Sequence, residues 1–248
     1  MNEVIQTILA HKSIRKFKSE PLSEETVTTL VECAQAASTS SYQQVYTIIG
    51  VEDKEKKRKL AELAGNQSYV ADNGYFFVFC LDYNRHLLAS EMKETNVSET
   101  IESTEGFIVG TVDVALAAQN LAIAAESLGL GIVYIGGIRN NLKEVSELMD
   151  CPDYVLPLFG MAVGYPDAEP GKKPRMPIEG VFHKNRYQKK EDSLNYLKQY
   201  DEESAEYYTK RTGGKRVEGW VSQMAANMAV PTRTYMKDFV HSKGLNKR

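Results

Sequence analysis

The feature that most constrains the fold is an uninterrupted apolar and aromatic run over residues 75–81, bounded by Gly74 and Asp82. A strand with one solvated face alternates apolar and polar residues, whereas a strand covered on both faces has no polar positions. The run therefore predicts the central strand of a sheet that is covered by helices on both sides. A chain of 248 residues is long enough to bury such a core.

Other segments supply the remaining elements. Strands are predicted over residues 44–51, 131–137 and 155–165, and helices over residues 2–10, 23–37, 53–65, 112–128 and 141–152. The helix over 112–128 is apolar around most of its circumference, which is typical of a domain centre or of a subunit interface, and we interpret it as a dimer spine. Residues 90–106 are polar without a clear period, so a mobile flap and an exposed helix both stay open.

Three positions resemble helix N-caps. Ser23 and Asp53 each precede a charged first turn, and Asn141 with Glu144 three residues later resembles a capping box. We therefore expect all three side chains to accept hydrogen bonds from the first turns of their helices.

Composition excludes several classes of function. With 30 basic and 33 acidic residues and a net charge of −3, the chain has no basic surplus for nucleic acid or anionic membranes, so a bound phosphate should belong to a small molecule. Three dispersed cysteines, Cys33, Cys80 and Cys151, predict neither a disulfide framework nor a metal site. Because no signal peptide or membrane span is recognisable, we expect a soluble cytoplasmic protein.

Two short basic stretches are candidate anion sites. His11, Ser13 and Arg15 alternate along the chain, so in extended backbone their side chains would point to one side. Lys173 and Arg175 flank Pro174, whose fixed backbone would direct both cations to the same side. Taken alone, each stretch favours a solvated basic turn or loop, because basic runs are usually exposed charge.

Three polar or glycine-rich segments add hydrogen-bonding groups. Residues 38–41 are four consecutive hydroxyl side chains, and residues 66–69 form another polar segment that we expect to be a loop tip. Gly136 and Gly137 end a predicted strand, where they would let backbone N–H groups approach a flat ligand or would simply form a tight turn. Gly129 and Gly131 follow a helix and precede a strand, so they do not form a dinucleotide-binding fingerprint.

In this order, the motifs at 11–15, 38–41, 67–69, 134–140 and 173–175 resemble those of the nitroreductase superfamily. The likeness is greatest to its NADPH-preferring branch, which includes the major oxygen-insensitive nitroreductase of enteric bacteria and the flavin reductase of luminous bacteria. The resemblance implies an α+β fold with a central, mainly antiparallel sheet flanked by helices, a C-terminal helical extension and an intertwined homodimer. Residues 1–183 would form the FMN-binding core. Residues 184–248 would extend the same single domain and contribute to the NADPH site and the dimer.

The resemblance also implies which residues bind FMN. His11 and Ser13 with Lys173 and Arg175 would hold the phosphate, and Arg15 would lie by the N1 and O2 edge of the flavin ring. The other implied cofactor-binding residues are Lys12, Ile14, Thr39, Gln67, Ser68, Tyr69, Tyr134, Ile135, Gly136 and Gly137. No metal is implied.

For the second substrate, the resemblance implies that Arg211, Lys215 and Arg216 bind the 2′-phosphate of NADPH. Ser41, Tyr42, Arg139 and Arg233 would face the substrate side. The implied reaction is ping-pong, with two-electron reduction of nitroaromatics, quinones or free flavins and no catalytic side chain beyond the hydride chemistry of FMN. The alternative is a flavin-binding or flavin-delivery protein with little turnover of its own.

Overall fold

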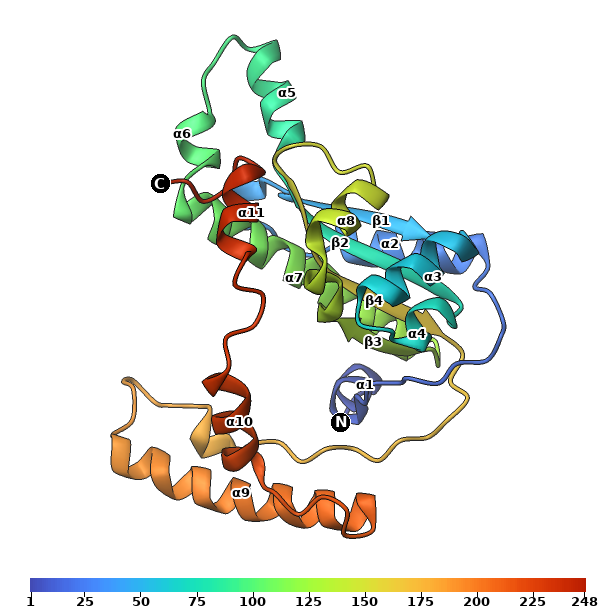
Figure 1. Cartoon of the computed structure of the whole chain (residues 1–248), viewed down its shortest axis with the longest axis vertical. Coiled ribbons are helices and arrows are strands. Elements are labelled where there is room, and N and C mark those ends of the chain that lie inside the picture. The colour runs from blue at the N-terminus through green and yellow to red at the C-terminus, as the bar shows by residue number, and fades with distance from the viewer. The chain divides into compact units, whose positions relative to one another are not determined.

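The computed structural model describes all 248 residues and divides them into two compact units (Figure 1). The first unit comprises Met1–Pro170 and Arg233–Arg248, and the second comprises Gly171–Thr232. The division of function between residues 1–183 and 184–248 stays a prediction.

The first unit is built on one four-stranded sheet. Its strands are β1 (Tyr46–Val51), β2 (Tyr75–Asp82), β3 (Gly131–Ile135) and β4 (Val155–Gly164), in the order β1-β2-β4-β3, and every neighbouring pair is antiparallel. β2 is an interior strand and its side chains from Phe76 to Leu81 are fully buried. The predicted central strand and the α+β class are therefore confirmed.

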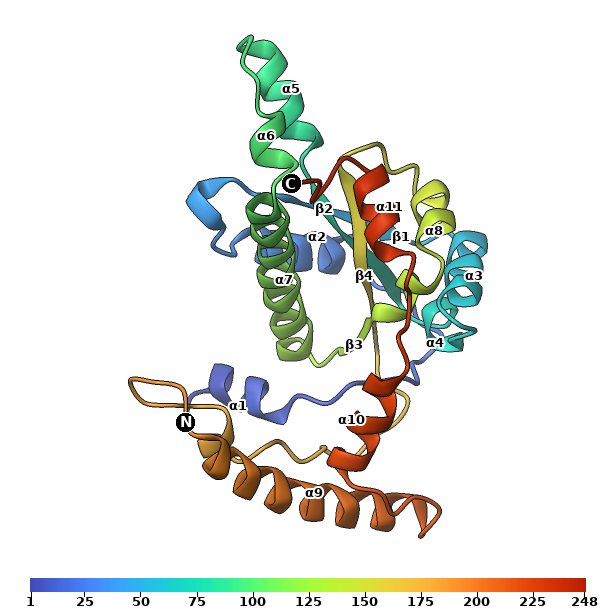
Figure 2. The same cartoon turned by 60° about the vertical axis from the view of Figure 1, so that its left-hand side comes forward.

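Helices cover both faces of this sheet, as the uninterrupted apolar run predicts. The helices of this unit are α1 (Glu3–Ala10), α2 (Glu24–Gln35), α3 (Lys54–Leu63), α4 (Ser68–Ala71), α5 (Asn84–Met92), α6 (Ser98–Ile101), α7 (Thr104–Ser127), α8 (Leu142–Leu148) and α11 (Met236–Ser242). Along β2, Phe77 and Phe79 belong to the core on the side of α2 and α7, whereas Phe76 and Val78 belong to the core on the side of α3 and α8. Figure 2 shows α7 on one side of the sheet and α3, α4 and α8 on the other.

Two of the three predicted N-caps are confirmed. Ser23 Oγ accepts from the N–H of Thr26 at 3.1 Å, and Asp53 Oδ1 accepts from the N–H of Lys56 at 2.7 Å. The capping box at Asn141 is wrong, because the Asn141 side chain makes no cap hydrogen bond. Its amide donates instead to the Leu63 carbonyl at 2.7 Å, which satisfies an acceptor left free at the C-terminal end of α3.

The long helix begins earlier than predicted, and two polar segments are partly helical. α7 begins at Thr104, and residues 90–106 contain the end of α5, all of α6 and the first turn of α7, so this segment is largely helical. The expected loop tip at 66–69 likewise includes the start of α4. α7 is long and apolar enough to cross a membrane by length and composition, and it packs against the sheet through residues such as Leu121. On another side Ile108, Val112 and Leu116 are about half exposed, so it is not buried all round within one chain.

The second unit is a pair of helices, α9 (Lys190–Thr212) and α10 (Trp220–Ala229). Side chains of α9 cap the start of α10. Ser204 Oγ accepts from the N–H of Trp220 at 2.7 Å, and Asp201 Oδ1 accepts from the N–H of Val221 at 2.6 Å. A side chain at Gly219 would collide with Asp201, so a glycine is required at this junction.

Candidate functional site

The N-terminal stretch that follows α1 is fixed along one end of the sheet. The N–H of Ile14 donates to the Ile132 carbonyl in β3 at 2.9 Å, and the N–H of Lys18 donates to the Tyr165 carbonyl at 2.9 Å. The side chains of Ile14 and Phe17, which belong to this stretch, are buried in the core. A Cβ at Gly131 would lie 2.5 Å from Ile14, so glycine permits the close approach.

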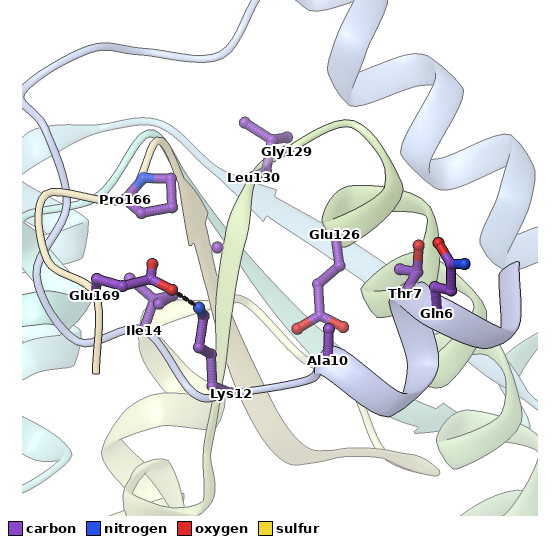
Figure 3. A pocket seen from close by; sticks show the side chains of 11 residues that line it. Gln6, Thr7, Ala10, Lys12, Ile14, Glu126, Gly129, Leu130, Pro166 and Glu169 are labelled. Carbon is purple, nitrogen blue, oxygen red and sulfur yellow. Dashed lines mark hydrogen bonds and ion pairs between the residues drawn. The ribbon is translucent and has the colours of Figure 1, made fainter. Parts of the chain in front are cut away.

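The polar side chains of this stretch fall into two groups. Lys12 forms an ion pair with Glu169 (Figure 3). Lys16 pairs with Asp167 at 2.8 Å, so carboxylates neutralise both cations. The side chains of Ser13 and Arg15 make no hydrogen bond or ion pair within the chain, which leaves them available to a ligand.

His11 is already engaged within the chain. Its Nδ1 lies 2.6 Å from Oε1 of Glu126 on α7, which orients the imidazole and leaves Nε2 as the free ring nitrogen. Glu126 and Lys12 line a cavity of about 380 Å³ beside Gly131 (Figure 3).

At the other end of β3, the glycine pair packs against a second predicted group. Gly136 and Gly137 begin the 3-10 turn η2 (Gly136–Asn140), and a Cβ at Gly137 would collide with the Ala64 carbonyl and the Gln67 amide. Gln67 Nε2 donates to the Ala64 carbonyl at 2.6 Å, and the hydroxyl of Tyr69 donates to Gln67 Oε1 at 2.6 Å. The structure therefore brings Gln67, Tyr69 and the glycine pair together.

Beyond this turn, two arginines lie near each other without a carboxylate partner. Arg139 Nη1 donates to the Leu158 carbonyl, and Arg233 donates through Nε and Nη2 to Asn140 Oδ1 at 3.0 and 2.8 Å. Burial, followed by the charge of Arg233, lowers the pKa of Arg139. Because all the acceptors are neutral, the positive charge of this corner is not compensated.

Tyr235, which precedes α11, fixes the backbone of the same corner. Its hydroxyl donates to the Arg139 carbonyl at 2.6 Å and accepts from the N–H of Leu142 at 2.9 Å. Tyr235 was not among the predicted site residues, because nothing in its local sequence indicates a contact with residues almost 100 positions earlier.

The hydroxyl-rich segment forms a strained loop around the 3-10 turn η1 (Ser40–Tyr42). Ser41, Tyr42 and Gln44 have positive φ values of 47°, 61° and 56°. Non-glycine residues rarely adopt this conformation, and strained backbone of this kind clusters at ligand-binding sites. The hydroxyl groups of Thr39 and Ser41 make no hydrogen bonds within the chain.

A buried carboxylate of α7 holds both ends of this loop. Asp113 is fully buried, and its two oxygens accept from the N–H groups of Ser40 at 2.9 Å and Val45 at 3.1 Å. From α5, His86 Nε2 lies 2.9 Å from the Gln43 carbonyl. The sequence prediction missed Asp113, although an acid flanked by apolar residues in the most apolar helix is a signal that could have identified it.

The remaining predicted cations belong to the second unit. Lys173 and Arg175 line a groove of about 470 Å³ beside α9, where Arg175 Nη1 donates only to the Lys173 carbonyl, at 3.2 Å. No carboxylate pairs with either cation. In the same groove Lys210 pairs with Glu206 at 2.5 Å, so its charge is neutralised.

At the C-terminal end of α9, two arginines are held by tyrosines and an amide. Arg211 Nη1 donates to the hydroxyl of Tyr207 at 3.0 Å, and Arg216 Nη2 donates to Gln223 Oε1 at 2.5 Å. The Arg216 guanidinium also lies 3.4 Å from the ring centroid of Tyr208. Lys215, between them in sequence, is exposed and has no partner.

Comparisons with known proteins find relatives that match the chain over its full length. The model of the nitroreductase family matches residues 8–165, and that of the nitroreductase family C-terminal domain matches residues 173–248. A protein of Bacillus subtilis (strain 168) described as FMN reductase (NADPH) is 54% identical over 248 residues and is covered completely, as is this chain. An NADPH-dependent oxidoreductase of Staphylococcus haemolyticus is 50% identical, with 96% of each chain covered.

Solved structures agree. NfrA1 of B. megaterium superimposes with a TM-score of 0.98 at 55% identity, covering 99% of this chain and 100% of the other. The NADPH:FMN oxidoreductase of Vibrio harveyi, solved with NAD+, superimposes with a TM-score of 0.90 at 41% identity, covering both chains completely. From these matches over its full length, the chain belongs to the nitroreductase family.

Proposed function

We propose that this chain is an NADPH-dependent FMN oxidoreductase that reduces free flavins, nitroaromatics or quinones in a ping-pong cycle of two-electron transfers. The enzyme class and the cofactors follow from its family and from full-length relatives named as an FMN reductase (NADPH) and an NADPH-dependent oxidoreductase. When bound, FMN supplies the hydride chemistry, so the protein contributes binding, orientation and electrostatics.

The observation that carries the proposal is how the predicted binding arginines are held. Arg139 donates to a backbone carbonyl, whereas Arg216 and Arg233 each donate to a side-chain amide oxygen. Each guanidinium is therefore oriented by a neutral group. An oriented guanidinium whose charge is not neutralised is suited to bind phosphate or to stabilise negative charge on a cofactor.

The donor groups of the first unit fit FMN. Ser13 and Arg15 flank Ile14, which bonds Ile132, and Ile132 precedes Gly136 by four residues. At ~3.3 Å per residue, about 13 Å of edge strand therefore separates the free donors from the glycine turn. Ser13 offers a hydroxyl for the anionic tail of the cofactor, Arg15 offers a cation two residues farther along, and the glycine turn offers closely packed backbone for the flat ring.

We assign the roles accordingly. His11 and Ser13 would bind the phosphate, and Arg15 would stabilise negative charge on the reduced ring. The backbone at Gly136 and Gly137 would contact the ring edge. Lys173 and Arg175 of the second unit are also proposed as phosphate ligands. Lys12, Ile14, Thr39, Ser68, Tyr134 and Ile135 remain predictions.

The strained loop and the arginine corner would face the second substrate. Asp113 fixes the backbone on both sides of Ser41 and Tyr42, whereas Tyr42 itself is 83% exposed. The Arg139 and Arg233 charges would attract the partly negative oxygens of a nitro group or a quinone, or the phosphates of a dinucleotide. We therefore infer that Ser41, Tyr42, Arg139 and Arg233 line the substrate side.

Exposed apolar helix faces support a homodimer. α1 carries Val4, Ile5, Ile8 and Leu9, yet none of its residues is buried within the chain. α7 exposes the stripe Ile108, Val112 and Leu116, spaced four residues apart. Contiguous apolar faces of this kind mark interaction surfaces, and we propose a second copy of this chain as the partner.

We also infer a cytoplasmic location, since all three cysteines are free thiols.

The test is to reduce the FMN-loaded protein anaerobically and to mix it by stopped flow with free flavins, nitroaromatics, quinones and disulfides. We expect rapid reoxidation by one or more of the first three classes and slow reoxidation by disulfides. A matched control is the Lys143→Ala variant, because Lys143 lies on the exposed side of α8 and pairs only with Glu147 at 3.9 Å. Uniformly slow reoxidation by every acceptor would contradict the proposal.

A further inference from the structure

We propose that Tyr208 and Gln223 are positioning residues that hold the Arg216 guanidinium ready for the 2′-phosphate of NADPH, and thereby set the preference for NADPH over NADH. This inference rests on the proposed function, which assigns Arg216 to that phosphate. It adds two residues that contact neither the nicotinamide nor the flavin and act through the arginine alone.

The geometry around Arg216 fixes the guanidinium from two directions. The guanidinium carbon Cζ lies 3.4 Å from the ring centroid of Tyr208, within the range of a close cation–π contact. In the plane of the group, Nη2 donates to Gln223 Oε1 at 2.5 Å. A face contact and an in-plane hydrogen bond together leave little rotational freedom to a side chain that otherwise has many rotamers.

The backbone of Arg216 is fixed as well. Its N–H donates to the hydroxyl of Thr212 in the last turn of α9 at 2.9 Å. Gly213 ends that helix in the left-handed conformation, and Gly214 also has a positive φ. The loop is therefore a defined C-terminal cap that places Arg216 beside Tyr208, one turn back along α9.

The chemistry of these partners preserves the charge of the arginine. Tyr208 and Gln223 are neutral, and they occupy one face and one edge of the guanidinium, whose planar fork has five N–H donors. The remaining donors can meet a dianionic phosphate without first breaking an ion pair. On the same helix, Lys210 pairs with Glu206 and therefore lacks this property.

Arg211 is held in a related but looser way. Its guanidinium lies 5.8 Å from the ring centroid of Tyr207 and donates to the hydroxyl of the same residue. Tyr207 and Tyr208 pack edge to face at 5.1 Å between centroids, so the two tyrosines form one aromatic platform. The shorter contact makes Arg216 the more rigidly positioned of the two cations.

The test is a double-mutant cycle on the FMN-loaded protein, with KM and kcat measured separately for NADPH and NADH. Tyr208→Leu removes the ring face but keeps an apolar side chain. We expect it to raise KM for NADPH by about two- to fivefold, the factor that corresponds to a partly exposed cation–π contact. KM for NADH and both kcat values should not change. Gln223→Ala should give the same pattern.

Controls separate positioning from a general structural role. Tyr208→Phe keeps the ring face, so it should retain the NADPH preference. In an Arg216→Ala background, Tyr208→Leu should have no further effect, because its influence acts through the arginine. Circular dichroism and flavin content establish that each variant is folded.

The outcomes distinguish this inference from the proposed function. Equal rises in KM for NADPH and NADH, or an undiminished Tyr208→Leu effect in the Arg216→Ala background, would overturn the positioning role. An Arg216→Ala variant with an unchanged NADPH preference would refute the phosphate assignment, and with it this inference, while leaving the oxidoreductase activity in place.

Discussion

Replacing Asp113 by asparagine should loosen the loop that carries Ser41 and Tyr42. The aspartate is fully buried and accepts from the N–H groups of Ser40 and Val45, one at each end of the loop. An asparagine of the same shape has one accepting oxygen and presents an NH₂ group toward the other N–H donor. One of the two clamps is then lost.

The magnitude follows from the loss of one of the two hydrogen bonds that hold the loop. Hydrogen bonds to charged groups contribute about 1.5–3 kcal/mol, and a buried donor left without a partner costs about 1–3 kcal/mol. Ser41, Tyr42 and Gln44 are held at positive φ, and each such non-glycine residue stores roughly 1–2 kcal/mol of strain. Once a clamp is lost, this strain favours opening of the loop. We expect Asp113→Asn to lower the free energy of unfolding by about 2–3 kcal/mol and to lower local loop stability by at least as much.

The assay is amide hydrogen exchange under native conditions, combined with urea unfolding. Exchange at residues 40–45 should accelerate, whereas the amides of β2 should keep protection in proportion to global stability. Gln44→Gly in the same background should recover part of the loss by relieving strain, and Asp238→Asn, an exposed aspartate on α11, is the control. Unchanged exchange at Ser40 and Val45 in Asp113→Asn would refute the clamp.

Three further predictions follow. Gly137→Ala should lower the free energy of unfolding in urea by about 1–3 kcal/mol and reduce flavin content, because the added methyl group would collide with the Ala64 carbonyl and Gln67. The control is Gly171→Ala, which should be nearly neutral because no atom lies within 4 Å of the added methyl group, and equal effects of the two variants would refute the argument. Burial raises the pKa of Tyr83 from 10.0 to about 12, so its hydroxyl contributes stability that is complete below pH 10 and is lost as pH rises through 12. The urea midpoint should therefore fall over this pH range, and it should fall less steeply in Tyr83→Phe; identical pH profiles of the two proteins would contradict this role of Tyr83. The hydrogen bond between the thiols of Cys80 and Cys151 raises the pKa of Cys80 and lowers that of Cys151, so a thiol reagent mapped by mass spectrometry should modify Cys151 before Cys80, and the reverse order would be evidence against this assignment.

Local signals predicted the sheet better than they predicted the site. The unbroken run at 75–81 specified a buried central strand because each residue type reports directly on whether a face is covered. Ser23 and Asp53 acted as caps because the interaction lies within one turn. Asn141 has the same local pattern, but a carbonyl of α3 almost 80 residues away attracts its side chain. A tertiary partner therefore overrides a cap when both use the same polar group.

For the candidate site, the motifs predicted candidate ligand-binding donors but not the groups that position them. Arg139, Gly137 and Ser41 are recognisable from resemblance, whereas Tyr235 and Asp113 act through contacts that only folding creates. The same holds for Tyr208, whose aromatic face matters because a helix cap returns Arg216 to it. Such residues have no signature in a single sequence, because their role is defined by geometry rather than by residue type.

The most direct test of the central claim is an anaerobic titration of the purified, FMN-loaded protein with NADPH, followed at the flavin absorbance maximum. If the chain is an NADPH-dependent FMN oxidoreductase, one equivalent of NADPH per bound FMN should bleach the yellow absorbance, and readmission of a quinone or free flavin should restore it. A protein that retains its flavin but is not bleached by NADPH would contradict the account.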